Sequence, residues 1–367
     1  MNGLEELNEH VSRRVKEEQI AVILFQPGYA ISPYLLFDLK IKYGLSLVSM
    51  CFDDEYLFEL ISSVYVRICD LVFTHDVVAV QRYRMAGIDA EWVMLAGQPP
   101  VSVPQENKHW KRKVSFVGTI SEEKPDRERF INYLKDHNLE VEVSGNANSE
   151  SNLYLSIGEM QDIFQTSQIS LNFSGISLFN NRFSHPLGNQ IRGAKARPFE
   201  IALAGGFCLS EHSVTLASVF RDGVDMAFFY NKDELVKKIQ FYLGHPELCI
   251  SIAQAGRKKA IEVTDPINVI ERLKSLPGTY SFQRSENLYG EKLGVEIPSY
   301  FRTDFIKYVF THTLKRFIKT RKWMEFYCSW RVLNNFLIRS GVRFPQGMLL
   351  LVLCGYCLER GLLKNNG

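Results

Sequence analysis

Residues 21–52, AVILFQPGYAISPYLLFDLKIKYGLSLVSMCF, indicate the fold class most directly. Ala21–Phe25 is a short apolar run typical of a buried strand, and Leu45–Phe52 is a second such run. Between the two runs, Pro33 suits the first turn of a helix and Gly44 suits its end. A strand, a helix and another strand in succession favour a parallel sheet with crossover helices, and therefore an α/β fold.

The same alternation continues as far as residue 95 and is then interrupted. The predicted elements are a helix from Glu55 to Arg67, a strand at Leu71–Thr74, a helix that Asp76 caps and Gly87 ends, and a strand at Glu91–Leu95. Such a series favours a parallel sheet that is covered by helices on both faces. Ala96–Lys113 contains three prolines and mixed charges, so we predict a linker between domains there.

A second alternating series follows the predicted linker. Its predicted strands are Val114–Val117, Glu140–Ser144, Ile169–Phe173, Phe207–Leu209 and Asp225–Tyr230, and its predicted helices are Asp126–His137, Glu159–Ser167, Pro198–Ala204, Asp233–Leu243, Pro246–Val263 and Pro266–Leu273. We therefore predict two tandem Rossmann-like, doubly wound domains facing a cleft, at residues 1–105 and 106–280. A linker and a basic, aromatic helical tail follow at residues 281–367. Ligands of such sheets bind at the carboxyl ends of the strands.

The composition is that of a globular protein, with 46% hydrophobic and 23% charged residues in a chain of 367. The N-terminal segment MNGLEELNEHVSRRVKEEQ is polar and carries charges of both signs, so it does not resemble a signal peptide. The seven cysteines lack the regular spacing of a disulfide framework and are predicted to be reduced thiols. No apolar run is long enough to span a bilayer. These features predict a cytoplasmic protein.

The last part of the chain, residues 301–367, is rich in Lys, Arg and aromatic residues. One interpretation is a helical appendage that packs its aromatic side chains on the body of the protein and leaves a basic face in solvent. The other is a surface attracted to anionic lipid, which would make the protein peripheral on the inner face of the cell membrane. No nucleic-acid-binding module is recognisable, so we expect no nucleic acid partner.

Residues 190–200, QIRGAKARPFE, are the most informative for function. Arg192, Lys195 and Arg197 lie just before a short helix that Pro198 is predicted to start. The first turn of a helix carries unpaired N–H groups and partial positive charge, so cations there are unfavourable unless an anion completes the site. A diphosphate fits this requirement. The alternative interpretation of the three cations is a solvated basic loop. Glu200 lies in the first turn of the same helix, and its presence could be explained by helix capping alone.

The chain resembles the CgeB-like (spore maturation protein-like) branch of group 1 glycosyltransferases, which have the GT-B architecture. The similarity covers roughly residues 20–275. The segments that carry it are Val114–Gly118, Arg127 at the start of a helix, Gln168–Asn172, Arg197–Gly206, Asp233–Leu243 and Ile252–Gly256. Their order and spacing resemble the family, which implies transfer of a hexose from a nucleotide-diphosphate sugar to a cell-surface glycan or a lipid-linked acceptor.

The resemblance also implies roles for single residues of the second domain. Glu200 would bind the ribose, and Lys195 and Arg197 the diphosphate. The remaining donor-binding positions are Gly118 and Thr119 at the phosphates, Ile157–Met160 beside the base, and Asn172, Ser210 and Glu211 at the sugar or ribose. Arg192, which also belongs to the predicted donor site, stands where many retaining relatives carry a second glutamate. The stereochemical outcome, retaining or inverting, is therefore open.

The first domain would hold the acceptor and any catalytic base. His75 and Asp53 each follow a predicted strand and are our candidates for the base. The alternative role of Asp53 is that of a turn residue. The alternative role of Asp76, which follows His75, is that of a helix N-cap. Basic groups and a helix end can stabilise a leaving diphosphate, so we predict no essential metal and no cofactor.

Two other functions remain alternatives to glycosyl transfer. The first is a GT-B-type nucleotide-sugar epimerase, which would convert a free nucleotide sugar without any acceptor. The second is a non-catalytic scaffold that binds a nucleotide without turning it over.

Overall fold

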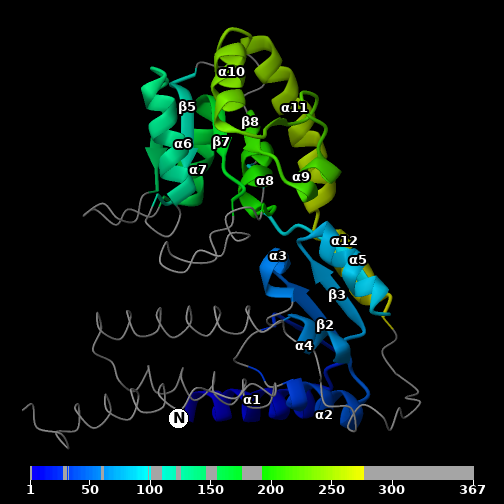
Figure 1. Ribbon diagram of the computed structural model, residues 1–367. Coiled ribbons are helices and arrows are strands. Elements are labelled where there is room, and N and C mark those ends of the chain that lie inside the picture. Colours follow the sequence, from blue (N-terminus) through cyan, green and yellow to red (C-terminus); the bar gives the residue numbers. More distant parts are fainter. Residues whose placement is uncertain are drawn as a thin grey trace, which may run out of the picture. The chain divides into compact units, whose positions relative to one another are not determined.

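The computed structural model describes residues 2–27, 31, 33–58, 62–97, 99–100, 110–120, 125–145, 155–175 and 192–276 (Figure 1). The chain divides into two compact units, of which the first comprises residues 1–51, 57–72 and 276–367 and the second residues 52–56 and 73–275. The predicted tail at residues 301–367 lies outside the described residues. The predicted domain boundaries remain predictions. Among the described helices, none combines the length and apolar character needed to cross a membrane.

The first sheet has four strands in the order β1-β2-β3-β4. The strands are β1 (Val22–Phe25), β2 (Ser46–Cys51), β3 (Leu71–Thr74) and β4 (Ala90–Trp92). β1 and β2 pair in parallel, with Val22 opposite Ser46. Every residue of β2 and β3 is buried, as expected for strands that are covered on both faces.

Helices of 3 to 17 residues accompany this sheet. They are α1 (Asn2–Glu18), α2 (Pro33–Tyr43), α3 (Asp54–Leu57), α4 (Ser63–Tyr65), the 3-10 turn η2 (Val66–Ile68) and α5 (Val77–Met85). The start and end of α2 were predicted from Pro33 and Gly44, and Gly44 has a φ of 66°, which suits glycine after a helix. Within the first unit, Lys40 forms a 2.7 Å ion pair with Asp70, which also accepts a hydrogen bond from the backbone N–H of Leu47.

The second sheet has five strands in the order β6-β5-β7-β8-β9, and all its pairs are parallel. The strands are β5 (Arg112–Val117), β6 (Glu142–Ser144), β7 (Ser167–Asn172), β8 (Cys208–Glu211) and β9 (Ala227–Phe229), and the helices are α6 (Pro125–Asp136), α7 (Ile157–Thr166), α8 (Ala196–Leu203), α9 (Val214–Val219), α10 (Lys232–Leu243), α11 (Pro246–Thr264) and α12 (Ile267–Lys274). The predicted α/β fold is thus confirmed.

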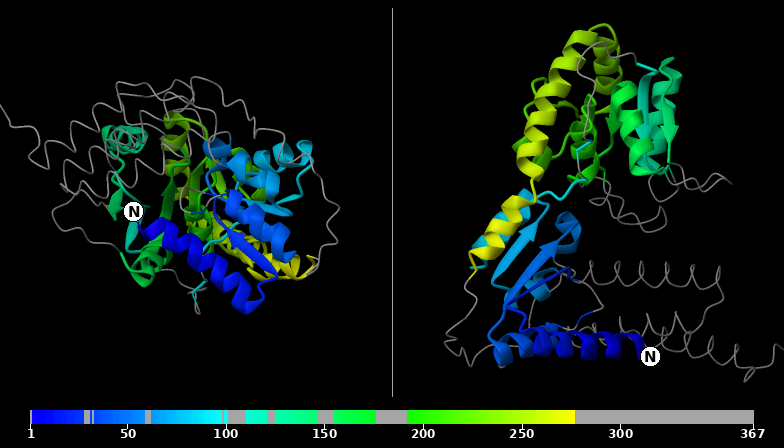
Figure 2. Two further views of the ribbon diagram at one scale, coloured as in Figure 1. Left: turned by 90° about the horizontal axis from the view of Figure 1, so that it is seen from below. Right: turned by 180° about the vertical axis from the view of Figure 1, so that it is seen from behind.

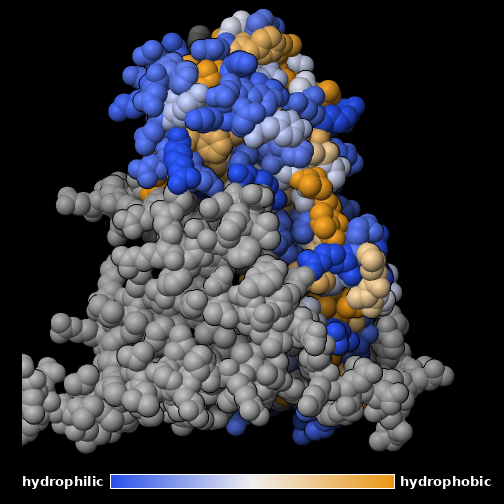
Figure 3. Space-filling view, viewed as in Figure 1, coloured by the Kyte–Doolittle hydropathy of each residue, from blue (hydrophilic) through white to orange (hydrophobic). Residues whose placement is uncertain are grey.

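Successive residues of the strands enter two separate cores, one on each face of this sheet. Phe116 and Phe229 pack with residues of α6, α10 and the first half of α11. Val117 and Phe228 pack on the other face with residues of α7, α8 and α9. Helices therefore cover both faces, and Figure 2 shows the sheet between them. Over α6, the outer surface is mainly hydrophilic (Figure 3), because each helix buries only its inner side.

Candidate active site

The start of α8 brings together four of the predicted donor-binding residues, Met160, Lys195, Arg197 and Glu200. The helix begins at Ala196 and not at Pro198, with Lys195 as its N-cap residue. Arg197, in the first turn, forms a 2.8 Å ion pair with Glu200 and donates to the sulfur of Met160. Arg197 therefore does not stand as an isolated cation at the helix end, because Glu200 balances part of its charge.

A further cation, Arg127, lies at the carboxyl end of β5. In the sequence it was one of the residues that carry the family resemblance, with no role in the predicted donor site. Arg127, in the first turn of α6, donates through Nη1 to the carbonyl oxygen of Thr119 at 2.9 Å. A Cβ atom added to Gly118 would lie 3.4 Å from the same Nη1, so glycine leaves room beside the guanidinium. The buried Nε of Arg127 has no hydrogen-bond partner among the described residues.

Arg127 is a buried cation that experiences the charge of a second cation. Burial lowers the pKa of Arg127, and the positive charge of Arg197 lowers it further. Two guanidinium groups that repel each other beside unpaired helix N–H groups gain stability when an anion binds between them. The only signal for Arg127 in the sequence was its place at the start of the first helix after β5.

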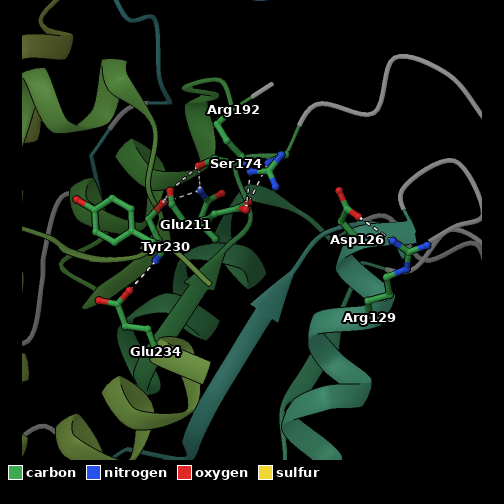
Figure 4. Close-up of polar contacts among 10 residues, drawn as sticks. Asp126, Arg129, Ser174, Arg192, Glu211, Tyr230 and Glu234 are labelled. Atoms are coloured by element: carbon green, nitrogen blue, oxygen red, sulfur yellow. Dashed lines mark hydrogen bonds and ion pairs between the residues drawn. The ribbon is translucent and has the colours of Figure 1, made fainter. Parts of the chain in front are cut away.

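The carboxyl ends of β7 and β8 hold a buried polar network (Figure 4). Asn172 donates to Ser210 Oγ at 2.9 Å and to Ser174 Oγ at 3.3 Å. Ser174 in turn donates to the carbonyl oxygen of Glu211 at 2.8 Å. Asn172 and Ser210 thus support each other inside the protein, and their predicted contacts with a sugar or ribose remain predictions.

Arg192 lies at this same edge, where it contacts Glu211. Its Nε is 2.6 Å from Oε1 of Glu211, and Oε2 of Glu211 accepts a 3.1 Å hydrogen bond from the backbone N–H of Gly175. The prediction placed Arg192 with Lys195 and Arg197 as a cation for diphosphate. The structure instead gives Arg192 a carboxylate partner 19 positions further along the chain.

The loop after β2 contributes acidic groups near the start of α8. Asp53 has a φ of 55°, in the left-handed region, and its carboxylate lies 3.7 Å from Nζ of Lys195. Glu55 accepts a 3.2 Å hydrogen bond from the backbone N–H of Ala194. Burial raises the pKa of Glu55 to about 8, and the negative charges of Asp76 and Asp53 add to the rise. Glu55 therefore carries a proton near neutral pH, and no motif in the sequence marks it.

The loop after β3 holds the other candidate base. Burial lowers the pKa of His75 to about 4, so its ring is neutral at physiological pH. The ring lies edge-on to Phe52 with centroids 4.5 Å apart, and its Nε2 has no hydrogen-bond partner among the described residues. Asp76 caps α5 by accepting from the N–H groups of Val78 and Ala79, so its predicted N-cap role is confirmed.

Metal-binding side chains do not cluster in the described part of the chain, where no group of three or more His, Cys, Asp or Glu residues could hold an ion. The described cysteines, Cys51, Cys69, Cys208 and Cys249, are not joined in disulfides.

Comparisons with known proteins agree with this architecture. Residues 124–275 match the model of a family described as glycosyl transferase-like. Sucrose-phosphate synthase from Thermosynechococcus elongatus is similar with a TM-score of 0.51 and 9% identity, over 74% of this chain and 76% of that one. HepE from Anabaena, in complex with UDP-glucose, is similar with a TM-score of 0.51 and 12% identity, over 74% of this chain and 82% of that one. No curated protein matches.

Two parallel α/β sheets and these structural likenesses show a GT-B-like fold, as predicted. The match of residues 124–275 to the glycosyl transferase-like family agrees with the predicted resemblance to glycosyltransferases. The assignment of the chain to the CgeB-like branch stays a prediction.

Proposed function

We propose that this protein is a glycosyltransferase that takes a hexose from a nucleotide-diphosphate sugar bound at the carboxyl edge of the second sheet. The observation that carries the proposal is the unpaired, buried Nε of Arg127 beside the like charge of Arg197. Buried guanidinium groups are costly when they lack an anionic partner. A diphosphate would supply negative charge for both side chains and for the N–H groups at the start of α8.

The same groups would promote the reaction. Negative charge builds up on the diphosphate as the bond to the sugar breaks, and fixed cations and helix N–H groups stabilise that charge in the transition state. Lys195, at the N-cap of α8, would add a third cation. Glu200 would then accept hydrogen bonds from the ribose hydroxyls, while its ion pair with Arg197 fixes the direction of its carboxylate.

UDP is the first nucleotide to test. The structure of HepE holds UDP-glucose, and its likeness to this chain motivates the choice without assigning a donor. The acceptor that we propose is a cell-surface glycan or a lipid-linked glycan, as the family resemblance implies.

His75 is the stronger of the two candidates for a catalytic base. A general base must be unprotonated at working pH, and the lowered pKa of His75 keeps its ring neutral, while the same shift weakens its hold on a proton. The carboxylate of Asp53 already has a cationic neighbour, Lys195 at 3.7 Å, which would compete with an acceptor hydroxyl for it. A proton taken from an acceptor hydroxyl by His75 would be partly balanced by the charge of Asp53, which raises the pKa of His75.

The proposal is tested by thermal shift and calorimetry with UDP, GDP and ADP. We expect one nucleotide to raise the melting temperature of the wild-type protein, and Glu200→Ala and Arg127→Gln each to weaken its binding by about tenfold or more. Glu234→Ala, on α10, is the matched control and is expected to bind like the wild type. A wild-type protein that binds none of the three nucleotides would contradict the proposal.

Product analysis then separates the proposed reaction from its alternatives. Transfer requires an acceptor, so a nucleotide hexose incubated alone should stay intact except for slow hydrolysis. Conversion of the free nucleotide hexose into its epimer would favour an epimerase. Tight binding without turnover, even with a cell extract as acceptor, would favour a scaffold.

A further inference from the structure

We infer that the loop after β2 is an internal competitor for the proposed diphosphate site, because Asp53 and Glu55 occupy groups at the start of α8 that a bound diphosphate would need. This inference rests on the proposed function, since it concerns the anion that binds there. It gives Asp53 and Glu55 a role in setting the affinity for the donor, which is separate from the role of a catalytic base.

Two carboxyl groups of this loop contact the chain just before α8. Oδ1 of Asp53 lies 3.7 Å from Nζ of Lys195, and Oε1 of Glu55 accepts a 3.2 Å hydrogen bond from the backbone N–H of Ala194. Residues 52–56 belong to the same compact unit as α8, so both contacts lie within one unit. A cation and a backbone N–H beside a helix start are groups that bind phosphate in proteins. Carboxyl oxygens of the loop therefore stand where phosphate oxygens of a donor would be favourable.

The residue between these two carboxyl groups anchors the loop. Asp54 is fully buried, and its Oδ2 accepts hydrogen bonds from the hydroxyl groups of Thr74 at 2.7 Å and of Tyr83 at 2.8 Å. Asp53 has a φ of 55°, a left-handed conformation that Asp and Asn adopt more readily than most residues. The turn at Asp53 and the anchor at Asp54 thus hold the competitor at the start of α8 before any ligand binds.

The contact at Lys195 is weak enough for a donor to displace it. The side chains of Asp53 and Lys195 are 37% and 42% exposed, and ion pairs this exposed contribute little to stability. A diphosphate carries more negative charge than one carboxylate, and in the proposed site it would also meet Arg127 and Arg197. Lys195 would therefore exchange Asp53 for the diphosphate, and the lost ion pair would lower the apparent affinity for the donor.

The surroundings of Glu55 make its part of the competition depend on pH. Burial raises the pKa of Glu55 to about 8, and the negative charges of Asp76 and Asp53 add to the rise. His75 is neutral in this range, because burial lowers its pKa to about 4. The nearby cation, Lys195, lies against Asp53.

The protonation of Glu55 decides how strongly it competes. Below about pH 8 its side chain is neutral, and it holds the N–H of Ala194 through an uncharged oxygen atom. Above this pH the carboxylate accepts the same hydrogen bond more strongly and repels an incoming phosphate. The affinity for a nucleoside diphosphate is therefore expected to fall as the pH rises through about 8.

Calorimetry at about pH 7 tests the competition at Lys195, with the tightest-binding of UDP, GDP and ADP as the probe. We expect Asp53→Asn to raise the affinity for the probe about threefold and Lys195→Gln to lower it about tenfold. Asp53→Asn added to Lys195→Gln should have almost no effect, because the competitor acts through the ammonium group that is already lost. Asp136→Asn, which removes an exposed carboxylate at the end of α6, is the matched control and should bind like the wild type.

The same titrations at about pH 9 test the part of Glu55. Glutamine keeps an oxygen that can accept from the N–H of Ala194, but it does not ionise. From about pH 7 to about pH 9 we expect the affinity of the wild type to fall about threefold more than that of Glu55→Gln. Other groups that titrate in this range are shared by the two proteins, so the difference between them reports on Glu55 alone.

The outcomes separate competition from simple repulsion of an anion. An equal gain from Asp53→Asn with and without Lys195 would show long-range repulsion and would overturn the competition for this cation. The absence of a gain in the wild-type background would overturn it as well. Identical pH dependence of the wild type and Glu55→Gln would overturn the role of Glu55. A wild-type protein that binds none of the three nucleotides would instead be a failure of the proposed function.

Discussion

Replacing Glu55 with glutamine is expected to change how the stability of the protein depends on pH. Burial raises the pKa of Glu55 to about 8 in the folded protein, from an ordinary value of 4.5. A raised pKa means that the folded state keeps a proton which the unfolded chain releases. The stabilisation from Glu55 is therefore fully present below about pH 4.5 and is lost as the pH rises toward 8.

The size of the stabilisation from Glu55 follows from the pH interval between about 4.5 and about 8. Each pH unit inside it lowers the free energy of unfolding by up to about 1.4 kcal/mol, so the step from about pH 5.5 to about pH 7.5 is worth at most about 2.7 kcal/mol. Glu55 is only partly buried, and solvent screening reduces this value to about 1 to 2 kcal/mol. Glutamine does not titrate, yet its side-chain oxygen can still accept from the N–H of Ala194.

Urea unfolding followed by tryptophan fluorescence at the two pH values measures the effect. We expect the free energy of unfolding of Glu55→Gln, relative to the wild type, to be about 1 to 2 kcal/mol higher at about pH 7.5 than at about pH 5.5. Glu262→Gln, an exposed position on α11, is the control and should show no such difference. The reasoning is refuted if the stability difference between Glu55→Gln and the wild type is the same at both pH values.

Three further substitutions test the packing and the caps through urea unfolding. Gly206→Ala would place its Cβ atom 2.8 Å from the carbonyl oxygen of Phe164, and we expect a loss of about 1 to 3 kcal/mol; a neutral effect would mean that α7 moves freely. Asp76→Ala removes the acceptor for two N–H groups of α5 and should cost about 1 kcal/mol, with Asp76→Asn largely preserving the cap. Lys40→Met leaves the buried carboxylate of Asp70 without its cation and should cost about 3 kcal/mol, and a loss near zero would contradict the role of this ion pair.

The inner strands β2, β3, β7 and β8 were predictable because all their residues are buried. Leu71–Thr74 is a continuous apolar run with β-forming residues, and its predicted bounds agree with β3. Helix ends were harder to predict where no capping side chain marks them. The start of α8 was placed at Pro198, but the helix begins at Ala196, because proline is tolerated within the first turn and Lys195 makes no capping hydrogen bond.

The sequence indicated which residues of the candidate site lie at the carboxyl edge of the sheet, but not which of their side chains pair with one another. The family resemblance implied Asn172 and Glu211, and both lie at the carboxyl ends of parallel strands, where ligands of such sheets bind. The partners of a side chain depend on rotamers and on neighbouring elements, so the Arg192–Glu211 pair had no signature in the spacing of the chain. The raised pKa of Glu55 likewise depends on burial and on charges from two separate loops.

Charge is distributed unevenly along the carboxyl edge of the second sheet. Among the described residues, Glu200 pairs with Arg197 and no carboxylate pairs with Arg127, so the mutual repulsion of the two guanidinium groups favours an anion. Around Gly175, by contrast, the carboxylates of Glu211 and Asp126 lie with the guanidinium groups of Arg192 and Arg129, so the charges there are balanced. The donor that we propose would therefore place its diphosphate near Arg127 and Arg197, because uncompensated cations gain more from an anion than a balanced cluster does.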